Sequence, residues 1–508
     1  MLHRPTIKKL LVCAVLLIAL LSLCACDSAA LPGKEAGGSS TEAQELSAHS
    51  HDGALPAARP GEILSYEQAL AAMGDSPDMV FTYTISLPGG SEFGPYSAVA
   101  DLSGLDSADV EAAAALLPNY PGLESIVLAP GSFTAEEVGI LCCDGRFETE
   151  YSFTLGDVEI DYYAESVDLS TLPAEFIPQA REILPYLPNL LNVELGAEGS
   201  SAFTWDDIEY LVNACENADF HYQFSLYGTW VRLRDRKLDL SYIPITDNGE
   251  ALLNAARGMY RLVYVDMDSC GLSNARMKEI RQALPRAKVV WRVWFGDKYS
   301  VRTDVTKILA SKPSGGGFVT DKDGEALSCC IYVKHLDLGH NDFLSDVSFI
   351  ASMPQLETLI LAMDPIRDIS PLANCPRLEY LELQTNDYLL DISPLANCPE
   401  LAHLNIARCR NLSDMSALMG LEKLERLWLG SINQIPASQL EDFRASHPDC
   451  EINTTVWSDP TSEGWRVSGM DPWTNEIFYH PRYELLMEQF GYIEEDYAFY
   501  WKDPKFRG

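Results

Sequence analysis

The chain is poor in basic residues. It has 37 Lys and Arg against 74 Asp and Glu in 508 residues, which gives a formal net charge of −37. Proteins that bind nucleic acids or anionic membrane surfaces need clustered Lys and Arg to neutralise phosphates. The charge therefore argues against a nucleic-acid partner. A cationic or neutral partner is easier to accommodate on this chain than an anionic polymer.

Cysteine is also sparse, at 13 residues in 508, which excludes a small disulfide scaffold. No Cys-x-x-Cys pair occurs, so a zinc site is not expected. Cys375 and Cys398 occupy equivalent places in two adjacent repeats, where apolar side chains normally fill the core. We expect buried thiols there, with a Cys375–Cys398 disulfide as the alternative.

The common catalytic motifs are missing. The chain has no His-Glu-x-x-His, no Gly-x-Ser-x-Gly and no Gly-x-x-x-x-Gly-Lys-Ser/Thr. Asp266-x-Asp268 resembles the start of a calcium loop, but the twelfth position is Met277 where that loop needs a bidentate Glu. The sequence therefore predicts no metal, no cofactor and no enzymatic activity.

Only one long hydrophobic run occurs, from Leu10 to Leu23, after a basic start. It is short for a membrane-spanning helix and suits the core of a signal peptide. It ends in Leu23-Cys24-Ala25-Cys26, which resembles a bacterial lipoprotein signal with Cys26 as the lipidated residue. An uncleaved signal anchor, or cleavage by the ordinary signal peptidase, are the alternatives.

We therefore expect residues 1–26 to be a signal peptide and residues 27–61 to be a flexible linker rich in Gly, Ser, Ala and Pro. This arrangement predicts an exported protein on the extracellular side of the cell membrane, held there through its lipid alone.

The clearest pattern is Leu-x-x-Leu-x-Leu, which occurs five times between residues 331 and 455, with Val333 and Ile406 each replacing one leucine. The central leucines are Leu336, Leu359, Leu381, Leu404 and Leu427. Between them Asp368–Pro376 recurs letter for letter as Asp391–Pro399. This pattern resembles the 22-residue, internalin-like class of bacterial leucine-rich repeats. The resemblance implies an α/β solenoid whose short strands form a parallel concave sheet.

Residues 62–310 also repeat, with a period of about 70 residues. An alternating strand stopped by glycine recurs at Tyr83–Gly89, Tyr151–Gly156 and Tyr222–Gly228, and more loosely at 291–296. Helices are expected after caps at Thr134, Thr204 and Ser273. We interpret this half as divergent, helix-bearing leucine-rich repeats, and residues 311–330 as an inserted, exposed loop. The pattern over roughly residues 80–505 resembles leucine-rich repeat lipoproteins of Gram-positive bacteria.

A candidate binding site follows from the strand pattern of the short repeats. Residues that flank the inward leucines point to the concave face, because side chains alternate along a strand. Aromatic and Arg residues are common anchors in protein interfaces. The predicted ligand-binding residues are His335, Asp337, Tyr380, Glu382, His403, Asn405, Arg408, Arg426 and Trp428. The expected ligand is a protein or a glycan.

The last segment, residues 456–508, holds 13 aromatic residues. The end of a solenoid exposes apolar core and needs a cap, so we expect this aromatic segment to cover that end. A separate sugar-stacking or partner-docking module is the alternative.

Together these features predict a lipid-anchored, non-catalytic surface protein that binds a macromolecule through its concave face. Two alternatives remain. One is a surface enzyme or glycan-processing accessory, with its site in the C-terminal aromatic segment or the 312–330 loop. The other is a structural spacer in the envelope.

Overall fold

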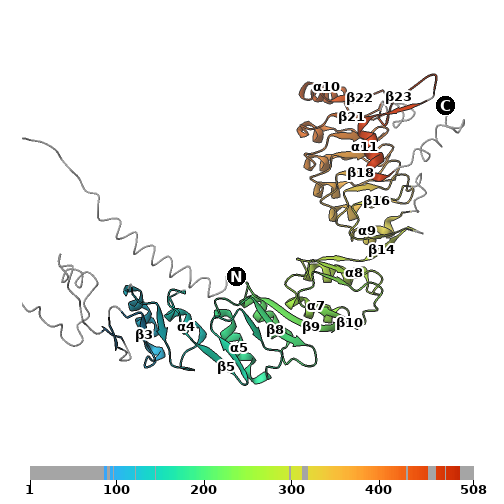
Figure 1. Ribbon diagram of the computed structural model, residues 1–508. Coiled ribbons are helices and arrows are strands. Elements are labelled where there is room, and N and C mark those ends of the chain that lie inside the picture. The colour runs from blue at the N-terminus through green and yellow to red at the C-terminus, as the bar shows by residue number, and fades with distance from the viewer. Residues whose placement is uncertain are drawn as a thin grey trace, which may run out of the picture. The chain divides into compact units, whose positions relative to one another are not determined.

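The computed structural model describes residues 85–87, 92–94, 97–120, 122–143, 145–296, 299–311, 319–430, 433–455, 465–474 and 476–491. They all belong to one compact unit, Met73–Gly508 (Figure 1). The predicted signal peptide, Cys26 and the linker lie outside the described residues. No helix in the described ranges is long and apolar enough to cross a membrane.

A β-hairpin, a strand, a helix, a parallel strand and a second helix recur in this order in the first half. The hairpins are β1 (Ile85–Ser86) with β2 (Glu92–Phe93), β5 (Ser152–Leu155) with β6 (Val158–Asp161), β9 (Asp219–Leu226) with β10 (Thr229–Arg232), and β14 (Arg292–Phe295) with β15 (Tyr299–Arg302). The parallel strands are β3 (Val99–Asp101), β4 (Ser125–Val127), β7 (Ser166–Asp168), β8 (Asn192–Ala197), β11 (Lys237–Asp239), β12 (Tyr264–Asp266) and β13 (Lys288–Val290). The helices are α3 (Val110–Leu116), α4 (Ala135–Leu141), α5 (Ile177–Ile183), α6 (Trp205–Ala214), α7 (Glu250–Gly258) and α8 (Asn274–Ala283).

The predicted helix starts are confirmed. Thr134 and Glu137 form a reciprocal capping box at the start of α4, and Thr204 and Asp207 form another at α6. The Ser273 hydroxyl accepts a hydrogen bond from the backbone N–H of the third residue of α8. These local bonds satisfy amide groups that a helix start leaves unpaired. Because they involve residues close together in the chain, the sequence predicts these helix starts.

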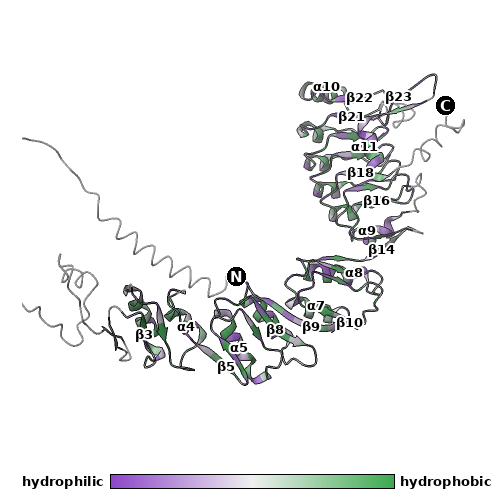
Figure 2. Cartoon of the chain, viewed as in Figure 1, coloured by the Kyte–Doolittle hydropathy of each residue, from purple (hydrophilic) through white to green (hydrophobic). Residues whose placement is uncertain are grey.

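The second half contains a parallel sheet, as the repeat pattern predicts, and the sheet has seven strands where the pattern has five copies. Its strands are β16 (Lys307–Leu309), β17 (His335–Asp337), β18 (Thr358–Ile360), β19 (Tyr380–Glu382), β20 (His403–Asn405), β21 (Arg426–Trp428) and β22 (Glu451–Asn453). The opposite side of each repeat is short: α9 (Gly324–Leu327), the 3-10 helices Ser348–Ser352, Ser370–Asn374, Ser393–Asn397 and Ser416–Gly420, and α10 (Ala437–Ser446). In Figure 2 the hydrophobic colour recurs repeat by repeat along this half.

Each strand of this sheet turns its central residue toward a core that runs along the repeats. That residue is a leucine in β17 to β21 and an isoleucine in β16 and β22. The turn after the strand is held by a polar side chain. The Asn386 amide donates to the carbonyls of Leu361 and Leu383, both at 2.8 Å. Asn341 bonds the same way one repeat pair earlier, while Asp364 and Cys409 take this position in the repeats between and after. These bonds satisfy backbone groups that the turn leaves inside the array.

The expectation of an exposed loop over 311–330 is wrong for its second part. Thr320 makes a β-bridge with Phe343, and Leu327, Cys329 and Cys330 are fully buried. This stretch is the outer side of the first short repeat, so its apolar residues fill the core. Residues 312–318 lie outside the described ranges.

We expected the aromatic segment to cover the end of the solenoid. The described part of the segment does not lie there. It forms β23 (Val467–Met470), β24 (Ile477–Tyr479) and α11 (Pro481–Phe490). It lies against the face of the sheet that points away from the main core, which we call the outward face and which the sequence predicts to be the concave binding face (Figure 1). We call residues 465–474 and 476–491 the hairpin–helix segment. It packs there because the outward face carries its own apolar cluster, separate from the main core. The last repeat ends instead with α10 and β22.

Candidate functional site

Eight of the nine predicted binding residues stand in two columns on one face of the sheet, and Arg408 lies in the turn after β20. Tyr380, His403 and Arg426 are in register with one another on β19, β20 and β21. Two residues further along the same strands, Glu382 stands beside Asn405, which stands beside Trp428. The prediction that the residues flanking the inward leucines share one face of the sheet is therefore confirmed.

The expectation that this face is open is wrong in the structure described. Tyr380 and Trp428 each retain 1% of their surface and Glu382 retains none. Asp337, His403, Asn405 and Arg426 are buried as well, whereas His335 and Arg408 are half-buried. The cause is the hairpin–helix segment, which covers the central strands.

Glu382 is the centre of this contact. Its Oε1 accepts hydrogen bonds from the indole Nε1–H of Trp465 at 2.9 Å, from the Arg466 Nε–H at 3.0 Å and from the Tyr380 hydroxyl. Its Oε2 accepts from the Gln384 amide at 3.0 Å and from Nη2 of Arg466. Two bonds from one guanidinium to one carboxylate make a charge-assisted fork, the strongest common type of side-chain pairing.

Burial by itself raises the pKa of Glu382, but the Arg466 charge and the hydrogen bonds from Arg466, Tyr380 and Gln384 outweigh it. The pKa of this carboxyl therefore lies below its ordinary value. Burial and the neighbouring carboxylate hold the pKa of Tyr380 well above its usual range, so its hydroxyl keeps the proton that it donates.

Trp465 is held by rings and by a guanidinium. Its ring centroid lies 5.2 Å from that of Trp428 and 5.5 Å from that of Tyr380. The Arg426 guanidinium stands 4.8 Å from the Trp465 ring and donates at 3.4 Å to the Trp465 carbonyl. Its Nε–H donates to Glu451 at 3.0 Å. Indole, guanidinium and carboxylate thus form one packed group.

The helix α11 covers the other end of the same face. Tyr483, Leu486 and Phe490 are buried against it, and the Phe490 ring meets the His335 ring edge-on at 6.1 Å. Arg482 lies over Tyr380, with its guanidinium 5.2 Å from the ring centroid.

His403 is a neutral histidine inside this contact. Burial and the nearby charges of Arg482 and Arg426 lower its pKa to about 3. The pKa of His335 is also lowered, mainly by burial. His480, which caps α11 by accepting from the Arg482 backbone N–H at 3.1 Å, has a lowered pKa for the same first reason.

Sequence reasoning missed Arg466 and Arg482. Arg466 follows Trp465 and Arg482 follows Pro481, in a segment that was interpreted from its aromatic residues alone. The indication in the sequence was indirect: a strand carboxylate such as Glu382 needs a cation if it is buried, and the chain has few Lys and Arg. The pairing joins residues 84 positions apart, so no local pattern reveals it.

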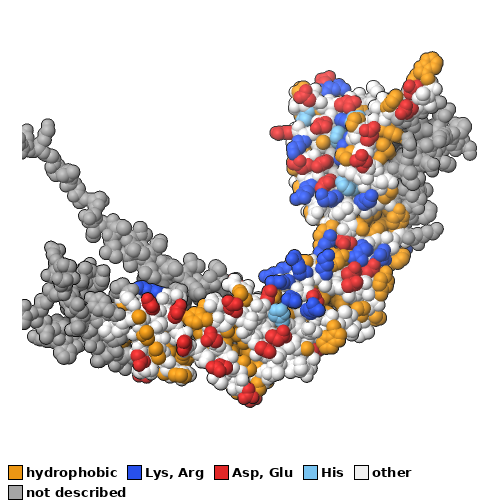
Figure 3. All heavy atoms as spheres, in the orientation of Figure 1, with side chains coloured by type: hydrophobic (Ala, Val, Ile, Leu, Met, Phe, Trp, Pro, Cys, Tyr) orange, Lys and Arg blue, Asp and Glu red, His pale blue; other side chains and the backbone are white. Residues whose placement is uncertain are grey.

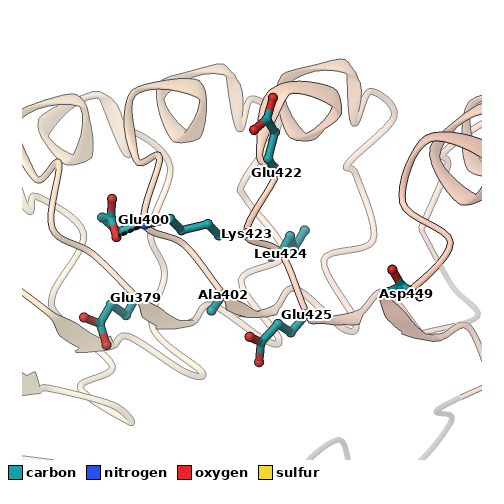
Figure 4. A pocket seen from close by; sticks show the side chains of 8 residues that line it. All are labelled: Glu379, Glu400, Ala402, Glu422, Lys423, Leu424, Glu425 and Asp449. Carbon is teal, nitrogen blue, oxygen red and sulfur yellow. Dashed lines mark hydrogen bonds and ion pairs between the residues drawn. The ribbon is translucent and has the colours of Figure 1, made fainter.

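An acidic pocket of about 360 Å³ lies where strands β19 to β22 begin. It is lined by residues from successive repeats: Glu379, Glu400, Ala402, Glu422, Lys423, Leu424, Glu425 and Asp449. Figure 4 shows the carboxylates pointing in different directions, with Lys423 paired to Glu400. They do not converge on one point, as a metal site or a general acid–base pair requires.

The overall acidity hides a basic region. Residues 232–312 hold 16 Lys and Arg against 9 Asp and Glu. In Figure 3 the Lys and Arg side chains gather over the region of α8 and β14. Several are paired, for example Arg302 with Asp266 at 2.8 Å and Arg292 with Asp268 at 2.9 Å. The exclusion of anionic partners drawn from the net charge is therefore weaker over this region.

Within the described ranges, no group of three or more His, Cys, Asp or Glu side chains is arranged to hold a metal ion. The ten described cysteines are free thiols, and Cys375 and Cys398 are fully buried. The Cys398 thiol donates to the Leu372 carbonyl at 3.4 Å, so these residues serve as core side chains.

Residues 354–397, which contain β18 and β19, match the family model described as "Leucine Rich repeats (2 copies)". The chain contains leucine-rich repeats. No curated protein matches it.

Several solved structures are similar to this leucine-rich repeat chain. An internalin, InlF, from Listeria monocytogenes is 12% identical, over 72% of this chain and 84% of that chain, with a TM-score of 0.24. A leucine-rich repeat protein from Leptospira interrogans is 15% identical, over 66% and 91%, with a TM-score of 0.28. The functional domain of InlJ from Listeria monocytogenes is 12% identical, over 59% and 66%, with a TM-score of 0.24. At these identities the likeness concerns the fold alone.

Proposed function

We propose that the protein is an exported, lipid-anchored leucine-rich repeat protein that binds a macromolecule, a protein or a glycan, and catalyses no reaction. The observation that carries the proposal is the outward face of β16–β22. It presents a register-matched set of aromatic, Arg and carboxylate side chains on a rigid sheet. Repeat solenoids use such sheets as extended binding surfaces.

The ligand-binding residues of this proposal are those predicted from the sequence. Because the hairpin–helix segment buries most of them, a partner meets this face only when the segment moves aside. The segment joins the sheet through side chains, since β23 and β24 pair with each other and form a sheet of their own.

The enzyme alternative placed its site in the C-terminal aromatic segment or the 312–330 loop. In the aromatic segment, Trp465, Tyr483 and Phe490 are buried in packing against the sheet. In the loop, Leu327, Cys329 and Cys330 are buried in the core. This supports the non-catalytic function.

The anchor is proposed at Cys26. Metabolic labelling with palmitate tests it: the wild-type chain takes up label and the Cys26→Ser chain does not. Equal labelling of both chains, or of neither, contradicts the lipid anchor.

The binding function is tested with the compact unit 73–508 immobilised and exposed to envelope glycans and surface proteins. A specific partner should be retained by the wild type and lost when Tyr380, His403, Arg426 and Trp428 are all replaced by Ala. The matched control replaces the exposed residues Asn397, Lys423 and Arg444 and should retain the partner. Circular dichroism verifies folding, and a partner that survives the fourfold change excludes this face.

A further inference from the structure

The carboxylate of Glu382 lacks a cation on its own sheet. It is fully buried, and its neighbours on β19 and just after it, Tyr380 and Gln384, are neutral donors. The nearby Arg426 is committed to Glu451 and to the Trp465 carbonyl. Among the described residues, the cation that pairs with Glu382 is Arg466, which comes from the hairpin–helix segment.

Beside this carboxylate lies a slot for an indole. Tyr380 and Trp428 provide its walls, and the Arg426 guanidinium stands over the inserted ring. The indole N–H and the adjacent guanidinium reach the same carboxylate oxygen, Oε1 of Glu382. The sheet thus recognises two consecutive residues through one group.

We propose that this slot and carboxylate form an acceptor for a polypeptide segment that presents Trp followed by Arg, and that Trp465-Arg466 occupies it in cis as a built-in competitor. The inference rests on the proposed function and names the partner class of that same face.

Charge decides between a polypeptide and a glycan here. A neutral glycan that displaced the segment would leave the Glu382 carboxylate buried without its cation, which is strongly unfavourable. An anionic glycan would add repulsion. An Arg side chain supplies both the charge and the fork geometry, and a neighbouring Trp fills the slot.

The test uses the 73–508 unit and a fluorescent peptide with the sequence of residues 463–491. In one protein variant, W465A/R466A, the cis competitor is removed while the acceptor stays intact. We expect this variant to bind the peptide at least about tenfold more tightly than the wild type, because a tethered competitor acts at a high effective concentration. A peptide carrying R466A should bind about a hundredfold more weakly, and R466K should restore only part of the loss.

The matched control is W473A/R444A, which removes a Trp that is 90% exposed and an exposed Arg. It should bind the peptide no better than the wild type. Adding E382Q to W465A/R466A should remove the gained affinity. The single variant R466A, which keeps Trp465, provides a second vacated acceptor if the double change disturbs folding, and circular dichroism verifies each chain.

Two results overturn the proposal: a folded W465A/R466A variant that binds the peptide no better than the control, or peptide affinity that persists with E382Q. If the wild type is a dimer and the W465A/R466A variant is a monomer, the cis arrangement is overturned, because a second copy of the chain then supplies Trp465 and Arg466. Peptide binding without retention of any envelope macromolecule leaves the acceptor intact and defeats the proposed function. Retention of an envelope macromolecule that is unchanged by E382Q supports the proposed function and defeats the acceptor.

Discussion

The two halves of the molecule expose the same strand position to different surroundings. On β3, β7 and β11 both residues that flank the buried central one are exposed, whereas on β18 to β21 all three residues are buried. Asp239 ends β11 in water and accepts from the Ser241 backbone N–H at 3.0 Å. Glu382 ends β19 beneath the hairpin–helix segment. A repeat sets where a side chain points, but a distant segment decides whether that side chain is solvated or needs a partner.

The largest difference in stability should appear between two variants that each remove the acid at the end of a strand, Glu382→Ala and Asp239→Ala. Glu382→Ala leaves Arg466 buried without its carboxylate and should destabilise the docked segment by about 3–5 kcal/mol. Asp239→Ala removes a solvated charge and the two exposed hydrogen bonds from Ser241, and should cost about 1 kcal/mol. Hydrogen exchange of the α11 amides and urea unfolding measure the two costs. Similar costs for both would erase the contrast between the halves.

Acid should open the covered half selectively. His403, with a pKa of about 3 when docked, takes up a proton near its ordinary value once the segment is released. The contribution of His403 to the docking of the segment is therefore fully present above about pH 6.5. It falls as the pH drops, by about 2 kcal/mol at pH 5. His335 and His480 add to the same trend, because their pKa values are lowered too.

Hydrogen exchange at pH 7 and pH 5 checks this. Protection of α11 should fall in acid and fall less in His403→Gln, while the β9–β10 hairpin stays unchanged. An α11 whose protection is independent of pH would show that the histidines do not sense docking.

A smaller effect of opposite sign in the two halves is expected for Asp-to-Asn changes. Burial holds the pKa of Asp364 well above its ordinary value, so its stabilising contribution is present in acid and is lost as the pH rises. Asp364→Asn should therefore stabilise the repeats at pH 8 by about 1 kcal/mol relative to the wild type, with a smaller gain at pH 5.

Asp168 is the exposed counterpart. Its hydrogen bonds from Ser170 lower its pKa, so its contribution is present at neutral pH and is lost below about pH 4. Asp168→Asn should slightly destabilise the chain at pH 8. Urea unfolding at the two pH values measures both changes, and the same sign for both would contradict the assignment.

The smallest effect should come from an exposed aromatic residue of the first half. Trp294 on β14 is 67% exposed, so Trp294→Ala should change the unfolding free energy by less than about 0.5 kcal/mol. Trp465→Ala, in the same urea titration, should cost several times more. A large cost for Trp294 would indicate a contact outside the described residues.

The parts predicted from the sequence are those with local signals. The central leucines and the shared face of the residues beside them follow from periodicity. The caps at Thr134 and Thr204 follow from short-range hydrogen bonds. The second hairpin strands, such as Val158–Asp161, were missed because a four-residue strand after a glycine turn has almost no pattern of its own.

The covering of the face was missed for a different reason. Trp465 and Arg466 meet Glu382 more than 80 residues away, and no repeat period connects them. The aromatic content of the tail indicated that it packs against something. It could not indicate the outward face, because the open end of the solenoid offers apolar surface as well.

A double-mutant cycle between Glu382 and Arg466 tests the central claim most directly. Glu382→Gln, Arg466→Gln and the double variant are compared through the free energy of opening of α11, measured by hydrogen exchange. The structure predicts a coupling energy of about 2 kcal/mol or more, with the double variant less impaired than the sum of the single ones. Additivity within about 0.5 kcal/mol, with α11 equally protected in all four chains, would mean that the segment does not dock on Glu382.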